Sequence, residues 1–174
     1  MITTEELRQL NGGFVNFDDA TLQFRLIATE KLIRRITNNN FQVRKARFTA
    51  ESVSGNLLLG KSEFIRVGDR VQITTTDIND NLYSVVSVTD TTEVNGELFA
   101  HSSNRVTKVH YSPDVIFGVV NMMLWDLIKR DKIGIKSEQI SRHKITYADT
   151  DTNHIHGYPP SLVGFLQPYM RAQT

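Results

Sequence analysis

The sequence predicts an α+β protein in which a small helical bundle of about four helices carries an inserted small antiparallel β-barrel or sandwich. Apolar residues recur at helical spacing before position 41 and after position 112, whereas between these positions they alternate as in strands. The length of 174 residues suits one domain with an insertion. We therefore expect a helical core from residues 1–40 and 113–174, and a β subdomain from residues 41–112.

The first two helices have recognisable ends in the sequence. Thr3 or Thr4 can cap a short first helix, with Glu6 three residues after Thr3 in the capping-box pattern, and Asn11-Gly12-Gly13 is expected to end this helix. Asp18 suits the N-cap of a second helix that continues to Thr37. The apolar positions of the second helix lie three or four apart and are expected to form one buried face: Leu22, Leu26, Thr29, Ile33 and Ile36.

The stretch 41–112 contains five or six short segments of strand-like polarity, bounded by turn residues. The clearest segments are 42–48, 70–74, 82–88, 92–94 and 105–110. Asn79-Asp80-Asn81 and Asn95-Gly96 are both expected to be turns. Short strands separated by turns favour a small barrel or sandwich.

The last third of the chain is expected to return to helix. Pro113 suits the first turn of a third helix, which is the most apolar segment and the expected centre of the core. A polar stretch, 137–157, contains a possible strand at 144–147. Pro159-Pro160 then opens a last short helix with one apolar face: Leu162, Phe165, Leu166 and Tyr169.

Composition excludes several functional classes. The chain has no cysteine, which removes disulfides, thiolate zinc sites and cysteine nucleophiles. Its net charge of +1 disfavours a general nucleic-acid coat, since duplex binders usually carry a clear basic excess. It has neither an apolar run long enough to span a bilayer nor a signal-peptide pattern, so we expect no membrane association.

The motifs that suggest metal chemistry are weak. Asp149-x-Asp151-x-Asn153 has the spacing of a calcium loop, but the sixth and twelfth positions lack the required Gly and Glu. His154 and His156 could offer two imidazoles, although this spacing usually points alternate side chains apart. Recognisable catalytic and phosphate-binding motifs do not occur. We therefore expect no catalysis, cofactor or metal, with a hydrolase that uses these residues as a minor alternative.

Three segments of the chain resemble one known family. They are the helix at 20–40, the apolar helix at 113–130, and a C-terminal region in which Ser137-Glu138 precedes a short strand. In that region Tyr158-Pro159 opens a helix that ends in Pro168-Tyr169. In this order the segments resemble the head–tail connector (adaptor or neck) proteins of long-tailed double-stranded DNA bacteriophages. The β-rich stretch between the helices departs from the simplest members of that family.

The resemblance implies a structural role in the virion, at the head–tail interface, after assembly in the host cytoplasm. Connectors of this kind form a ring, commonly of twelve subunits, beneath the portal protein. The ring extends the DNA channel and binds the next neck component, a head-completion (stopper) or tail-completion protein. DNA would pass through this channel without sequence-specific binding.

The expected contact with the portal lies in the C-terminal segment 157–174. Aromatic residues, Met and Arg are enriched at interface centres, which selects Tyr158, Tyr169, Met170 and Arg171. Pro159 and Phe165 complete the expected contact. One alternative is that the last helix only closes the core; another is that Trp125 is the interface anchor. An alternative function is a small-barrel binding module with helical flanks that recognises a peptide or a nucleic acid.

Overall fold

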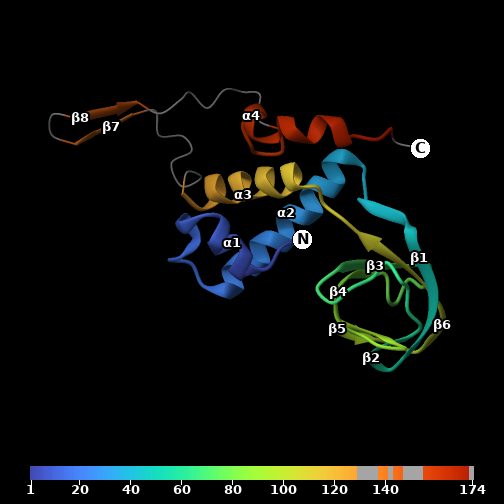
Figure 1. The fold of residues 1–174 in the computed structure, drawn as a ribbon. Coiled ribbons are helices and arrows are strands. Elements are labelled where there is room, and N and C mark those ends of the chain that lie inside the picture. Colours follow the sequence, from blue (N-terminus) through green and yellow to red (C-terminus); the bar gives the residue numbers. More distant parts are fainter. Residues whose placement is uncertain (129–136, 141–142, 147–154, 173–174) are drawn as a thin grey trace. The chain divides into compact units, whose positions relative to one another are not determined.

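The structure, a computed structural model, describes residues 1–128, 137–140, 143–146 and 155–172 (Figure 1). The described residues form four α-helices and a closed six-stranded antiparallel barrel, so the protein is α+β. The chain divides into two compact units. The helical unit comprises Met1–Asn39 and Ser112–Thr174, and the barrel unit comprises Asn40–Tyr111.

The N-terminal helix, α1 (Thr4–Leu10), begins with the predicted capping box. Glu6 N–H donates to Thr3 Oγ1 at 3.1 Å, and Thr3 N–H donates to Glu6 Oε2 at 2.8 Å. Asn11 ends the helix and caps the short 3-10 helix η1 (Gly12–Phe14) with its side-chain oxygen. The predicted end of this helix at Asn11 is therefore confirmed.

The long helix α2 (Asp19–Thr37) begins at the predicted N-cap, where Asp18 Oδ1 accepts a 2.8 Å hydrogen bond from Thr21 N–H. Its buried face follows the predicted stripe as far as Ile33, but Thr37 is buried where Ile36 was expected. The Thr37 hydroxyl donates to Ile33 O at 2.7 Å, which satisfies it inside the core. The buried residues are Leu22, Leu26, Thr29, Glu30, Ile33 and Thr37.

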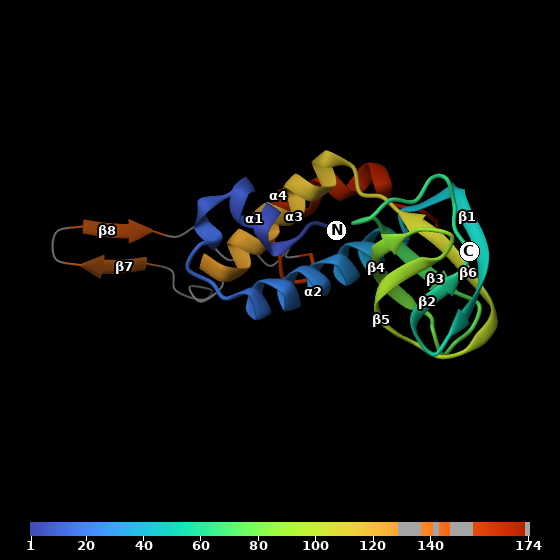
Figure 2. The same ribbon diagram turned by 60° about the horizontal axis from the view of Figure 1, so that its bottom comes forward.

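The apolar helix α3 (Pro113–Ile128) begins at Pro113 as predicted and packs against α2 and the C-terminal helices (Figure 2). Within this apolar helix Asp126 is buried, whereas Ile128 at its end is exposed. The buried residues are Val115, Gly118, Val119, Val120, Met122, Met123 and Asp126. None of the described helices is both long and apolar enough to cross a membrane.

The C-terminal part contains a strand pair and two short helices. β7 (Ser137–Ile140) pairs antiparallel with β8 (His143–Thr146), which matches the strand predicted from 144 except that Tyr147 lies outside the described residues. The predicted last helix is divided into α4 (Pro160–Val163) and the 3-10 helix η3 (Gly164–Tyr169). Val163 and Leu166 are their buried apolar residues.

The barrel unit closes in the strand order β1-β2-β5-β4-β3-β6, with β6 pairing back onto β1 (Figure 1). It is therefore a barrel and not a sandwich, and neighbouring strands are antiparallel throughout. The strands are β1 (Gln42–Val53), β2 (Gly55–Leu59), β3 (Arg70–Thr74), β4 (Asn81–Val88), β5 (Thr92–Leu98) and β6 (His101–Val109). Inward side chains of these strands, together with Ile65 from the connection between β2 and β3, form the core: Ala50, Leu58, Ile65, Val71, Ile73, Tyr83, Val85, Val94, Leu98 and Val106.

Two sequence expectations for the barrel are corrected. Asn95-Gly96 is not a turn but the middle of β5, where Asn95 Oδ1 accepts a 2.5 Å hydrogen bond from Ser84 N–H. A Cβ at Gly96 would lie 3.0 Å from the Tyr83 ring, so the glycine lets this ring cover the strand. β2 was not predicted, because its sequence, Gly-Asn-Leu-Leu-Leu, does not alternate in polarity.

Candidate partner-binding site

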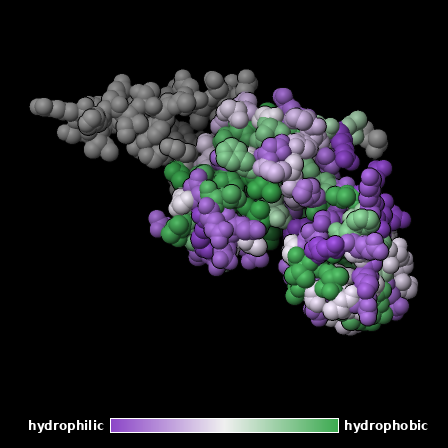
Figure 3. Space-filling model, viewed as in Figure 1, coloured by the Kyte–Doolittle hydropathy of each residue, from purple (hydrophilic) through white to green (hydrophobic). Residues whose placement is uncertain are grey.

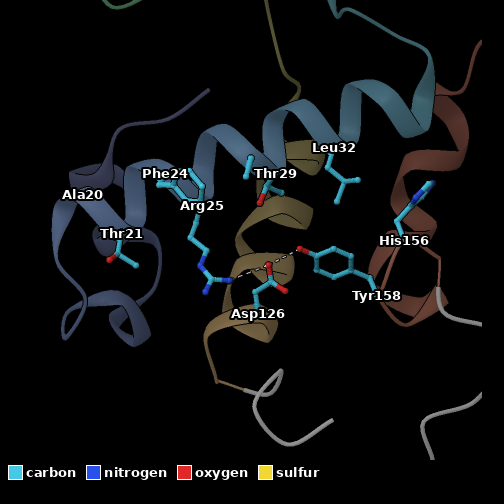
Figure 4. Close-up of a pocket in the computed structure, with 10 residues that line it drawn as sticks. Ala20, Thr21, Phe24, Arg25, Thr29, Leu32, Asp126, His156 and Tyr158 are labelled. Carbon is cyan, nitrogen blue, oxygen red and sulfur yellow. Dashed lines mark hydrogen bonds and ion pairs between the residues drawn. The ribbon is translucent and has the colours of Figure 1, made fainter. Parts of the chain in front are cut away.

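A groove of about 710 Å³ runs along one side of α2 in the helical unit (Figure 4). Four turns of α2 form one wall, and α3 and the segment 155–158 form the rest. The residues that line the groove are Ala20, Thr21, Phe24, Arg25, Ala28, Thr29, Leu32, Asp126, His156 and Tyr158.

A carboxylate with two partners lies at the base of this groove. Tyr158 donates a 2.6 Å hydrogen bond from its phenol to Asp126 Oδ2, and Arg25 Nη1 lies 3.6 Å from the same oxygen (Figure 4). Asp126 is only 8% exposed, and a buried charge needs both pairing and hydrogen bonding. The Tyr158 ring also packs against Trp125, with ring centroids 5.5 Å apart. The arrangement therefore ties the C-terminal segment to α2 and α3.

A tight turn brings Tyr158 to this position. Ile155 and Tyr158 exchange two backbone hydrogen bonds, of 2.9 and 3.0 Å. The two residues between them, His156 and Gly157, both have positive φ, of 51° and 86°. Positive φ at both central residues is the requirement of the type I′ turn. The turn leaves the exposed His156 at the edge of the groove.

The wall of the groove is a second apolar face of α2, which the sequence analysis did not identify. Ala20, Phe24, Ala28 and Leu32 are spaced by four residues and so follow one line along the helix. Phe24 is 73% exposed on this line. The sequence contains a signal for this second face. Its four residues repeat every four positions, as a helix face requires, and they are separate from the buried series that contains Leu22 and Leu26.

The structure corrects one expected portal contact. Tyr158 is 3% exposed, and its side chain packs inside the helical unit, so it is not available to a partner. Tyr169 is half-buried, and its hydroxyl bonds Asp114 Oδ2 and Ser112 Oγ, each at 2.7 Å. Hydrogen bonds from the hydroxyls of Ser112 and Tyr169 lower the pKa of Asp114 below its usual value.

Phe165, another expected contact, is half-buried against α3. A Cβ added to Gly118 would lie 2.4 Å from the Phe165 ring, so the ring occupies the space that the glycine leaves on the helix. Pro159 is half-buried where α4 begins. Both residues thus contribute to the packing of the C-terminal segment on its own unit.

Met170 and Arg171 are the two expected contacts that remain at the surface. Met170 is 52% exposed, and Arg171 is exposed as well. The backbone around them is held in place, because Arg171 N–H donates to Thr37 O at 2.8 Å and Asn39 Nδ2 donates to Tyr169 O at 3.1 Å. The structure therefore presents two exposed side chains on an anchored backbone.

Most residues of the weak metal motif lie outside the part of the chain that the structure describes. Asp149, Asp151, Asn153 and His154 lie outside the described residues, and His156 is at the edge of the groove. Among the residues that the structure describes, no group of three or more His, Asp or Glu side chains could hold a metal ion.

No protein-family model matches the chain, and no curated protein matches it in sequence.

Proposed function

We propose that this protein is a structural neck protein of a long-tailed double-stranded DNA bacteriophage. In this proposal twelve subunits form a ring beneath the portal protein, at the head–tail interface of the virion. The ring extends the DNA channel and binds a head-completion or tail-completion protein. DNA passes through it without sequence-specific contacts.

The observation that carries the proposal is the anchored C-terminal segment. Its path is held by the Tyr158–Asp126 hydrogen bond at one end and by the bonds from Arg171 and Asn39 at the other. Met170 and Arg171 then project from a fixed backbone. A backbone that is already anchored does not have to be ordered on binding, which supports a docking role for this segment.

Apolar side chains at the surface of the helical unit support self-association (Figure 3). They lie on α1, the connection after it, α2 and α3: Leu10, Val15, Phe24, Ile27, Phe117 and Ile128. Extensive exposed apolar surface marks interaction sites. In the proposed ring the helices form a bundle that carries the barrel as an insertion, and successive subunits contact each other through different faces.

The proposal is tested with purified portal particles. Incubation with the protein should add a ring of density beneath the portal in negative-stain images. Particles that gain no ring would refute the proposal. The isolated protein can be monomeric in this account, because assembly proteins often order their interfaces only on docking.

The closed barrel supports one competing function, a binding module for a peptide or nucleic acid. Phe64 and Val67, in the connection between β2 and β3, are both exposed on the barrel unit. A module of this kind stays monomeric in size-exclusion chromatography with portal present and shows ligand-dependent chemical shifts in the barrel. A neck protein co-elutes with the portal.

A further inference from the structure

The charged residues of the barrel unit are segregated. Residues 40–111 contain eight basic and eight acidic residues. The adjacent strands β1, β6 and β3 carry six of the basic residues and one of the acidic ones. The adjacent strands β2, β5 and β4 carry no Lys or Arg. The barrel unit therefore has no net charge, but its basic strand residues are confined to one side of the barrel.

The basic face lies on the adjacent strands β1 and β6 and consists of the exposed residues Arg44, Lys45 and Arg47 on β1 and Arg105 on β6. Arg105 lies opposite Thr49 in the β1–β6 register, and Arg47 lies opposite Thr107 two positions along. Arg47 Nε donates to Thr107 Oγ1 at 3.0 Å, which holds its guanidinium across the two strands.

The acidic face consists of Glu93 and Glu97 on β5. They alternate with the buried residues Thr92, Val94 and Leu98, so their side chains lie on the outer surface of the barrel. Neither glutamate forms an ion pair with another described residue. By contrast, Asp90, in the turn before β5, is paired with Lys61 at 2.8 Å.

In the closed six-stranded order, β5 and β6 are separated by two strands in either direction. Arg105 on β6 therefore lies across the barrel from the acidic face, and the basic residues of β1 are separated from β5 by β2, so the two faces are on different sides of the barrel. We infer that the basic face of one barrel binds the acidic face of the barrel in a neighbouring copy of this chain. Two different faces on one unit produce a head-to-tail contact, and such contacts close into rings when the rotation permits.

The chemistry favours a second copy over a nucleic acid as the occupant. A nucleic-acid-binding domain usually has a basic excess, whereas this barrel has equal numbers of both charges. Phosphate binding gives no role to Glu93 and Glu97, but pairing between copies uses both faces. Charge complementarity of this kind also sets the register between partners.

The inference rests on the proposed ring, because exposed ion pairs are individually weak and are screened by salt. A ring holds neighbouring barrels at a high effective concentration, which makes such a contact sufficient to order them. The barrel contact then fixes how each barrel is oriented relative to the next.

The absence of cysteine allows a direct test with single introduced cysteines. Thr49→Cys lies beside Arg105 on the basic side, and Val86→Cys lies on β4 beside the acidic strand. Both positions are exposed, and both substitutions leave every charge in place. In portal-bound protein, and in concentrated free protein at low salt, a short bismaleimide should link the Thr49→Cys variant to the Val86→Cys variant. Neither variant should be linked to itself.

Charge reversal tests the cause of the contact. Arg105→Glu in the Thr49→Cys variant should lower the linked fraction about tenfold, and Glu93→Lys in the Val86→Cys variant should do the same. Combining these two reversed variants should restore linking, because the charges again match. Lys31→Glu is the control, since it makes the same change in net charge at an exposed position of α2 in the helical unit and should leave linking unchanged.

Linking within a single variant, or linking unaffected by charge reversal, would overturn the inference. A ring that forms on the portal without these links would overturn it while leaving the proposed function intact. Charge-dependent links without portal binding would support the barrel contact and refute the neck function. If the chain binds duplex DNA, loses that binding on Arg105→Glu and shows no links, the basic face binds nucleic acid and the inference is wrong.

Discussion

The phenol of Tyr158 and the carboxylate of Asp126 are joined by a buried 2.6 Å hydrogen bond. The two residues lie 32 positions apart, on the turn before α4 and near the end of α3. Arg25, on α2, lies 3.6 Å from the same carboxylate oxygen. One buried group thus connects two helices and the C-terminal segment.

Tyr158→Phe should destabilise the protein by about 1–3 kcal/mol, because it removes a hydrogen bond from a buried charged acceptor. Urea unfolding followed by circular dichroism measures the change as a lower midpoint with an unchanged slope. Asp126→Asn and the double variant complete a double-mutant cycle. If the effects of the two substitutions are additive, the hydrogen bond does not contribute to stability.

Gly118→Ala should loosen the C-terminal segment, although alanine favours helix by about 1 kcal/mol over glycine. The added Cβ would lie 2.4 Å from the Phe165 ring, and overpacking of this kind costs about 1–3 kcal/mol. Limited proteolysis should therefore cleave the segment 155–172 faster. Phe165→Leu in the Gly118→Ala background should reduce the cleavage rate, whereas Phe165→Leu alone should increase it. Equal cleavage of Gly118→Ala and wild-type protein would contradict this packing.

Acid should weaken the start of α2 through Asp18. Hydrogen bonds from the backbone N–H and the hydroxyl of Thr21 lower the pKa of this carboxyl below its usual 3.8. A lowered folded-state pKa gives stability that is present above pH 3.8 and is lost as the pH falls through the folded value. Asp18→Asn keeps the cap but removes the titration. The variant should therefore lose less stability between pH 7 and pH 3 than wild type, as measured by urea midpoints; equal losses would exclude this contribution.

The parts of the fold that depend on nearby residues were predictable from the sequence. The Thr3–Glu6 capping box and the Asp18 N-cap join residues three positions apart, and both are confirmed. The change from helical to strand periodicity near position 41 is confirmed for the same reason, since periodicity is a local property.

The errors occur where distant residues decide the structure. Asn95-Gly96 has the sequence of a turn, but it lies inside β5, where the Asn95 side chain accepts a hydrogen bond from Ser84 N–H of β4. Tyr158 has the composition of an interface residue, yet Asp126 and Trp125 hold it in the interior. The groove on α2 likewise depends on α3 and the 155–158 turn, which sequence periodicity cannot place beside it.

Asn79→Ala should destabilise the barrel by about 2–4 kcal/mol, as the loss of several buried hydrogen bonds predicts. Asn79 is buried, and its amide bonds both the N–H and the C=O of Phe99 at 2.9 Å. It also donates to Asn104 Oδ1 at 3.0 Å. Thermal unfolding should show this loss of stability as a lower melting temperature. Asn81→Ala, at an exposed neighbouring position, is the control and should lower the melting temperature less. A smaller loss for Asn79→Ala than for Asn81→Ala would contradict the network.

Met170→Ser combined with Arg171→Glu should abolish docking on portal particles while leaving the fold intact. Both side chains are exposed, and the anchoring bonds of this segment come from the backbone at Tyr169 and Arg171, so the substitutions leave those bonds in place. Surface substitutions of this kind usually change stability by less than about 0.5 kcal/mol.

Truncation after Pro168 is a less specific test of the same contact. It also removes the Tyr169 bonds to Asp114 and Ser112, which hold the segment against α3. The double substitution separates docking from folding, because circular dichroism and the urea midpoint should match wild type. Lys31→Glu, an exposed charge reversal on α2, is the control and should retain docking. If the double variant adds a ring to portal particles as wild type does, the portal contact lies outside Met170 and Arg171.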